Sequence, residues 1–118
     1  EYIWPYLGIS GGDVTPLLVE AMNLSVERGA YVASVVENTP SSRAGLQGAS
    51  ETVTLDGRTI DVGGDVITAI DGTPILSFDD LLIYLSLNTS PGQMVTLSIL
   101  RDGETHAVQV TLEARPGS

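Results

Sequence analysis

The sequence contains no cysteine and no lysine. All five of its basic residues are arginine, and against 15 acidic residues they leave a formal net charge of −10. The missing cysteine excludes disulfides, zinc–thiolate sites and cysteine nucleophiles. The low positive charge argues against a nucleic-acid partner and against direct binding to an anionic membrane surface. We attribute the acidity to solubility rather than to a charged ligand.

Long apolar runs are also missing. No run approaches the roughly 18 residues that a membrane span needs. No secretory signal is visible either, so we expect the chain to be a domain cut from a longer protein.

Catalytic and metal-binding patterns are equally scarce. The single histidine, His106, lies near the end of an expected hairpin, and no Gly-x-Ser-x-Gly sequence occurs. We therefore interpret His106 as a surface strand residue and expect no catalytic residue. The spacing of Asp56, Asp61 and Asp65 does not fit an EF-hand loop, so we expect no metal site and no cofactor.

The residues that are present indicate one strand-rich domain over 1–118. The chain has 118 residues, 42% of them hydrophobic, with 13 glycines and six prolines. That length supports one compact core, and the glycine and proline content predicts many turns.

Capping residues predict two helices. Thr15 with Pro16 begins a short helix that ends near Asn23, and Ser77 begins a second over about 78–87. In the second helix, Asp79 and Asp80 complement the helix dipole. A single helical turn is expected at 41–46, strands at 6–10, 30–36, 65–70, 94–101 and 105–113, and a flexible tail at 114–118.

Residues 47–63 predict an additional hairpin. Alternating segments at 52–55 and 58–62 flank Asp56-Gly57, and Asp-Gly between such segments is a strong hairpin signal. We place this hairpin at a sheet edge, with the alternative that it folds over a ligand groove.

The segment Tyr6-Leu7-Gly8-Ile9, followed by Ser10-Gly11-Gly12, is the most informative of the chain. Glycine at position 8 permits a tight turn that aims several backbone N–H groups at one point. Convergent N–H donors suit a carboxylate, including the C-terminus of another protein.

The second expected helix is apolar on more than one face. At helical spacing, Phe78, Leu82 and Ser86 form one stripe, with Leu81 and Leu85 beside it. A second apolar surface is what the wall of a groove needs. The alternative is a helix that is fully buried between the sheet and the inserted hairpin.

Several short motifs follow one another in a characteristic order and spacing. They are Tyr6-Leu7-Gly8-Ile9, Gly29-Ala30-Tyr31-Val32, Ser42-Arg43-Ala44-Gly45-Leu46, Gly64-Asp65-Val66-Ile67, Ile70-Asp71-Gly72, Ser77-Phe78 and Arg101-Asp102-Gly103. Together they resemble a PDZ domain, in the circularly permuted arrangement of bacterial HtrA/Deg-type serine proteases. The resemblance covers the chain from Tyr6 to Glu113, with residues 47–63 as its one clear departure.

The resemblance implies an α+β fold: a PDZ-like partly open β-barrel or sandwich of about five strands, with two helices and the inserted hairpin. It also implies a peptide-binding site. The N–H groups of Leu7, Gly8 and Ile9 would hold a peptide carboxylate, and Ile9, Ser10 and Gly11 would pair with the peptide as an edge strand. Phe78, Leu82 and Ser86 would form the opposite wall.

The implied function is non-catalytic capture of C-terminal peptides with an apolar last residue. Such a module would recognise substrates for, or regulate, an attached serine endopeptidase whose protease domain lies upstream. The implied location is extracytoplasmic, periplasmic or at the cell surface, with or without a membrane anchor on the parent protein. The alternatives are a PDZ domain of a site-two zinc protease or a carboxy-terminal processing protease, or a structural spacer with an occluded groove.

Overall fold

The computed structural model describes residues 5–114. For Trp4 the sequence leaves two interpretations open, an anchor on the core or a contact to a neighbouring domain, and this residue lies outside the described residues. So do residues 115–118 of the expected tail.

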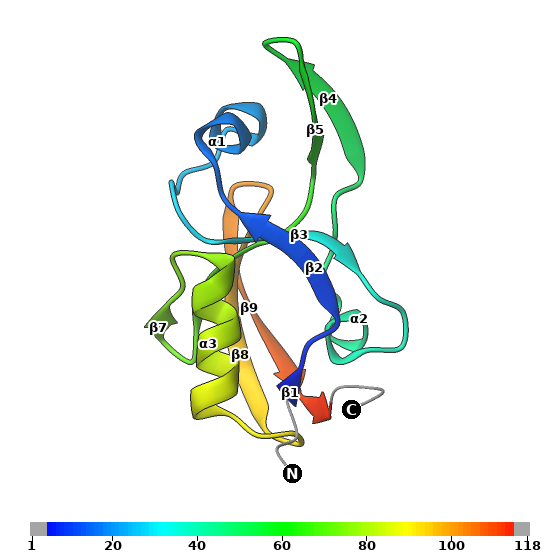
Figure 1. The fold of residues 1–118 in the computed structure, drawn as a ribbon, viewed down its shortest axis with the longest axis vertical. Helices are drawn as coiled ribbons and strands as arrows, with labels where there is room; N and C mark the ends of the chain where they lie inside the picture. The colour runs from blue at the N-terminus through cyan, green and yellow to red at the C-terminus, as the bar shows by residue number, and fades with distance from the viewer. Residues whose placement is uncertain (1–4, 115–118) are drawn as a thin grey trace.

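The main sheet has six strands, and β2 lies at one of its edges (Figure 1). Along the sheet the strand order is β2-β3-β6-β8-β9, and β7 pairs with β6. Two further sheets have two strands each: β1 pairs with β10, and β4 pairs with β5. The bounds are β1 Pro5–Tyr6, β2 Ile9–Asp13, β3 Ala30–Val35, β4 Glu51–Leu55, β5 Arg58–Val62, β6 Val66–Ile70, β7 Thr73–Pro74, β8 Met94–Arg101, β9 Glu104–Thr111 and β10 Glu113–Ala114.

Three helices accompany the sheets: α1 Pro16–Met22, α2 Pro40–Ala44 and α3 Phe78–Asn88. The side chains of Thr15 and Ser77 accept hydrogen bonds from the N–H groups of Leu18 and Asp80, as their N-cap positions predict. The α+β class is therefore confirmed, and the sheets form no closed barrel.

Two details at the chain ends differ from the expected elements. The run 6–10 is not one strand, because the backbone turns at Gly8 and separates β1 from β2. Ala114, which we expected in the tail, pairs with Pro5 in the small sheet of β1 and β10. A flexible tail over the remaining residues stays a prediction.

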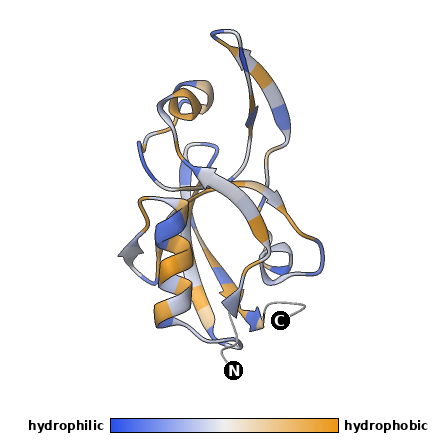
Figure 2. Cartoon of the chain, in the orientation of Figure 1, coloured by the Kyte–Doolittle hydropathy of each residue, from blue (hydrophilic) through white to orange (hydrophobic). Residues whose placement is uncertain are grey.

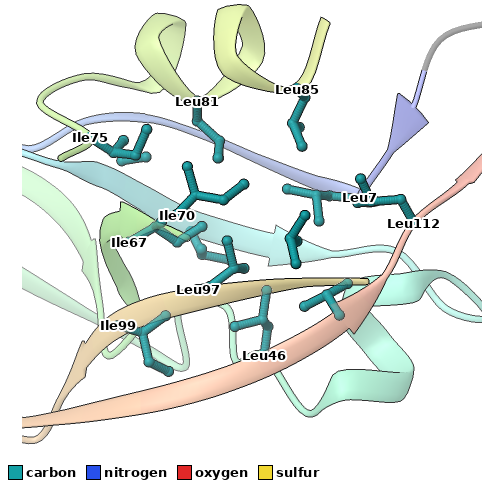
Figure 3. Close-up of a cluster of buried hydrophobic side chains, with 14 residues drawn as sticks. Leu7, Leu46, Ile67, Ile70, Ile75, Leu81, Leu85, Leu97, Ile99 and Leu112 are labelled. Atoms are coloured by element: carbon teal, nitrogen blue, oxygen red, sulfur yellow. The ribbon is translucent and has the colours of Figure 1, made fainter. Parts of the chain in front are cut away.

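The larger core cluster lies between α3 and the sheet (Figure 3). Leu81 and Leu85 of α3 are buried against β6 and β8, which contribute Ile67, Ile70 and Leu97. Leu7 belongs to the same cluster and is 4% exposed. The core therefore fixes both α3 and the start of β2, the two elements that border the candidate site.

A second, smaller cluster holds the inserted hairpin. Val62 of β5 packs with Leu18 of α1, Tyr31 of β3 and Val66 of β6. The hydroxyl of Tyr31 donates to the carbonyl of Asp61 at 3.1 Å and accepts from the N–H of Gly64 at 3.1 Å. Burial raises the pKa of Tyr31, and the Gly64 bond opposes part of that effect.

Candidate functional site

A groove lies between the edge strand β2 and helix α3. Its volume is about 510 Å³. None of its lining residues carries a charge, and most are apolar. They are Pro5, Tyr6, Leu7, Gly8, Ile9, Ser10 and Gly11 on one side and Phe78, Leu81, Leu82, Leu85 and Ser86 on the other. The structure thus brings all the predicted site residues to one groove.

The loop at the base of the groove, formed by Leu7 and Gly8, is fixed by hydrogen bonds that its carbonyl groups accept. The carbonyl of Leu7 accepts from the N–H of Ser41 at 2.9 Å, and that of Gly8 accepts from the N–H of Val36 at 2.8 Å. In a trans peptide, C=O and N–H point in opposite directions, and the peptides after Leu7 and Gly8 are trans, as are the others within residues 5–114. The N–H groups of Gly8 and Ile9 therefore point away from α2 and β3, and both residues line the groove.

Glycine is required at position 8 for two reasons. Its φ is +89°, a left-handed conformation that side chains disfavour. A Cβ atom there would also lie 2.3 Å from the side chain of Thr39. Thr39 is itself fixed, because its hydroxyl donates to the carbonyl of Val36 at 2.7 Å. The tight turn expected from the sequence is confirmed.

The edge of β2 that faces the groove is open. Ile9 lies opposite Val35, and the bond from Val36 to Gly8 flanks this pair. In an antiparallel ladder this makes Ile9 and Val35 a non-hydrogen-bonded pair, so the N–H and C=O of Ile9 face away from β3. The Ser10 hydroxyl contacts the Ser34 hydroxyl of β3. Ile9 is thus the residue whose backbone is oriented to pair with an added strand.

Glycine at position 11 allows a close contact between β2 and β3. A Cβ atom at this position would lie 1.8 Å from the carbonyl oxygen of Tyr31. The register between β2 and β3 also shifts between Ser10 and Gly11. A Cβ on Gly12, in contrast, would have no atom within 4 Å. No local pattern in the sequence distinguishes these two glycines.

Helix α3 divides its apolar residues between the core and the groove. Leu81 is fully buried, whereas Leu82 is 48% exposed and lines the groove. Ile83, on the outer side, is 54% exposed. Figure 2 shows apolar residues along much of this helix. The alternative interpretation, a helix buried between sheet and hairpin, is therefore wrong.

The hairpin of β4 and β5 lies away from the groove (Figure 1). No residue of 47–63 belongs to the groove lining. The hairpin instead packs on α1, through Val53 and Val62 in the smaller core cluster. It therefore does not occlude the groove.

The remaining sequence interpretations concern metals, membranes and His106. Within residues 5–114, no group of three or more His, Asp or Glu side chains is placed to hold a metal ion. No helix in that range is long and apolar enough to cross a membrane. His106 is exposed on β9, opposite Ile99, as expected of a surface strand residue.

Asp65 and Asp13 make polar contacts that were not predicted from the sequence. Asp65 is fully buried and receives two hydrogen bonds from Arg101. Asp13, at the end of β2, accepts a hydrogen bond from the N–H of Phe78 at the start of α3. Each joins residues far apart in the sequence, so no local pattern points to them.

The family profile of the PDZ domain matches residues 5–112. The chain is 34% identical over 112 residues to the periplasmic pH-dependent serine endoprotease DegQ of Escherichia coli, covering 95% of this chain and 21% of that protein. It is 35% identical over 113 residues to the periplasmic serine endoprotease DegP of the same organism, covering 95% and 20%. The chain thus spans about a fifth of the length of these curated relatives.

Solved structures give the same result. The HtrA-type protease AlgW with a decapeptide superimposes with a TM-score of 0.76 at 27% identity, covering 98% of this chain and 31% of that chain. The HtrA3 PDZ domain bound to a phage-derived ligand, FGRWV, gives 0.70 at 25% identity, covering 97% and 89%.

The chain belongs to the PDZ domain family. Within that family it is homologous to the PDZ domains of HtrA-type serine proteases such as DegP and DegQ.

Proposed function

We propose that this chain is a peptide-binding module that captures peptides by their free C-termini and adds them as a strand to the edge of β2. The observation that carries the proposal is the uncharged groove, whose base presents the N–H groups of Gly8 and Ile9 and whose side is the open edge of Ile9. Backbone pairing gives such a site affinity, and side-chain pockets give it specificity.

The proposed role of each residue follows its position in the groove. The N–H groups of Leu7, Gly8 and Ile9 bind the carboxylate, and Ile9, Ser10 and Gly11 pair with the peptide. Leu7, Ile9 and Leu82 surround the last side chain, and Ser86 continues the wall on that side. Phe78, which contacts Asp13 at the far end of β2, forms the wall beside the upstream peptide residues. An apolar lining without charge favours an apolar last residue, because burying a charge there without a partner is costly.

Two structural relatives support peptide binding, since AlgW is known with a decapeptide and HtrA3 with the ligand FGRWV. We further propose that the parent protein is an extracytoplasmic HtrA-type serine endopeptidase with its protease domain upstream, and that this domain selects its substrates or regulates it. Its relatives DegQ and DegP are periplasmic serine endoproteases. A zinc-protease domain in place of a trypsin-like domain in the parent would contradict this assignment.

A pair of variants on α3 tests the binding site. Leu82→Glu places a charge in the groove, whereas Ile83→Glu places the same charge on the outer side of the helix, where Ile83 is 54% exposed. We expect micromolar binding of a peptide with an apolar C-terminus, about −8 kcal/mol. Fluorescence anisotropy should show at least a tenfold loss (about 1.4 kcal/mol) for Leu82→Glu and a change within about twofold for Ile83→Glu. Equal affinities of the two variants would contradict the proposed groove.

A further inference from the structure

A direct hydrogen bond joins the two walls of the groove. The Oδ1 atom of Asp13, the last residue of β2, accepts from the N–H of Phe78, the first residue of α3, at 2.8 Å. The two residues are 65 positions apart in the sequence. The acceptor is a carboxylate and the donor is a free N–H of the first helical turn, so charge and helix dipole both favour this bond.

This contact lies at the end of the groove opposite the loop of Leu7 and Gly8, where we propose that the peptide carboxylate binds. On β2 the lining ends at Gly11, two residues before Asp13, and on α3 it begins at Phe78. A peptide whose carboxylate sits at the loop before β2 extends along β2 toward Asp13. Its last residue therefore lies near Gly8, and residues farther upstream approach the bond between Asp13 and Phe78.

The first turn of α3 does not depend on Asp13 for its own capping. The Ser77 hydroxyl accepts from the N–H of Asp80 at 3.1 Å, and the Asp80 carboxylate accepts from the N–H of Leu76 at 3.0 Å. These two bonds form a local cap across the helix start. The bond from Phe78 to Asp13 adds a link to the opposite wall, and its loss leaves the helix capped.

We propose that Asp13 is a positioning residue that sets the distance between β2 and the start of α3, and so fixes the upstream half of the peptide groove. This inference rests on the proposed function. Without the bond, the first turn of α3 around Phe78 loses its direct link to β2, while the rest of the helix stays fixed by the buried Leu81 and Leu85. The affinity contributed by the peptide carboxylate and the last peptide side chain is then unchanged, whereas the affinity contributed by residues farther upstream in the peptide falls.

The test is a peptide-length series measured by isothermal titration calorimetry. Free-acid peptides of three, five and seven residues share the same last three residues and are titrated into wild type, Asp13→Ala and Asp13→Asn. In Asp13→Ala we expect the tripeptide to bind within about twofold of wild type and the five- and seven-residue peptides to bind about tenfold more weakly. Asp13→Asn keeps an acceptor for the Phe78 N–H and should restore the affinity for the longer peptides to within about threefold.

Asp79→Ala is the matched control, because it removes an acidic charge from the same helix end without removing the bond; all three peptides should keep their affinity. An equal loss for all lengths in Asp13→Ala, or no loss at any length, would overturn the inference. If the alanine variant does not fold, Asp13→Lys, which has no acceptor, serves in its place. A wild-type protein that binds amidated peptides as tightly as free acids would instead overturn the proposed function itself.

Discussion

Arg101 and Asp65 form a two-pronged ion pair at the base of the inserted hairpin. Arg101 Nε donates to Asp65 Oδ1 at 2.8 Å, and its Nη2 donates to Oδ2 at 2.7 Å. The same carboxylate accepts from the N–H of Gln47, and Arg101 also donates to the carbonyl of Gly45. The hydrogen bonds to Asp65 raise the pKa of Arg101 above its ordinary value. One arginine on β8 thus holds both ends of the segment 47–63 in place.

Removing this arginine should destabilise the domain strongly. Arg101→Met leaves the carboxylate of Asp65, whose side chain is 0% exposed, with only the Gln47 N–H as a partner. We expect a loss of about 3–5 kcal/mol in the free energy of unfolding, measured by urea denaturation. Arg43→Met is the control, since the pair of Arg43 with Glu113 is half exposed and should contribute about 0–1 kcal/mol. Similar losses for both variants would contradict the assigned role of the buried pair.

Tyr31 should make the stability fall at high pH. Burial raises its pKa in the folded state above the ordinary value of 10.0. Below pH 10 both states keep the proton, whereas above it the unfolded state loses its proton first, and unfolding becomes easier. Urea midpoints measured from pH 8 to pH 11 should therefore decrease, and Tyr31→Phe should flatten the decrease. At pH 7, Tyr31→Phe should lower the free energy of unfolding by about 1–2 kcal/mol, because it removes two hydrogen bonds. An unchanged slope in Tyr31→Phe would show that another group causes the fall.

Two glycine substitutions should differ sharply in how much they lower the stability of the fold. Gly8→Ala combines a φ of +89° with a Cβ atom 2.3 Å from Thr39, and we expect it to lose about 2 kcal/mol or more of stability. Gly12→Ala places its Cβ in open space and should change stability by less than about 1 kcal/mol. Thermal denaturation of both variants measures the difference. A stable Gly8→Ala variant that still binds peptide would mean that the loop has another conformation.

Shortening the inserted hairpin should leave peptide binding intact. Val53 and Ile60 are cross-strand partners, so an Asn-Gly turn in place of residues 54–59 closes a shorter hairpin. We expect this variant to lose less than about 1 kcal/mol of the free energy of unfolding, because the packing on α1 is kept.

Replacing all of 47–63 by a short link removes Val62 from the smaller cluster. This variant should lose about 2–5 kcal/mol of the free energy of unfolding, while its groove still binds peptide. Loss of peptide binding on tip removal would identify the hairpin as part of the site.

The sequence predicted the parts of this fold that local chemistry determines. Thr15 and Ser77 mark helix starts because an N-cap bonds within three residues, and Gly8 marks the turn before β2 because few other residues adopt its conformation. Thr39-Pro40 carries the same capping pattern at α2, which begins at Pro40, one residue before the helical turn that we expected at 41–46. The sequence could have shown this helix start.

Contacts between distant residues were not predictable in the same way. Asp13 lies beyond the strand that we expected at 6–10, and Asp65 begins the strand that we expected at 65–70. Their partners, Phe78 and Arg101, lie 65 and 36 positions away. Many arginines and backbone N–H groups could satisfy an aspartate, and only the fold selects one. The reason for glycine at position 11, close contact with the Tyr31 carbonyl, likewise depends on how β2 and β3 meet.

The most direct test of the account is calorimetry with one peptide in two forms, a free C-terminal acid and its amide. The N–H groups of Gly8 and Ile9 point away from α2 and β3 in residues that line the groove, and we propose that they bind the carboxylate that only the acid carries. We predict micromolar binding of the acid and a loss of about 1.5–3 kcal/mol for the amide, the range for a hydrogen bond to a charged group. Equal affinity of the acid and the amide would contradict the claim that this groove recognises peptide C-termini.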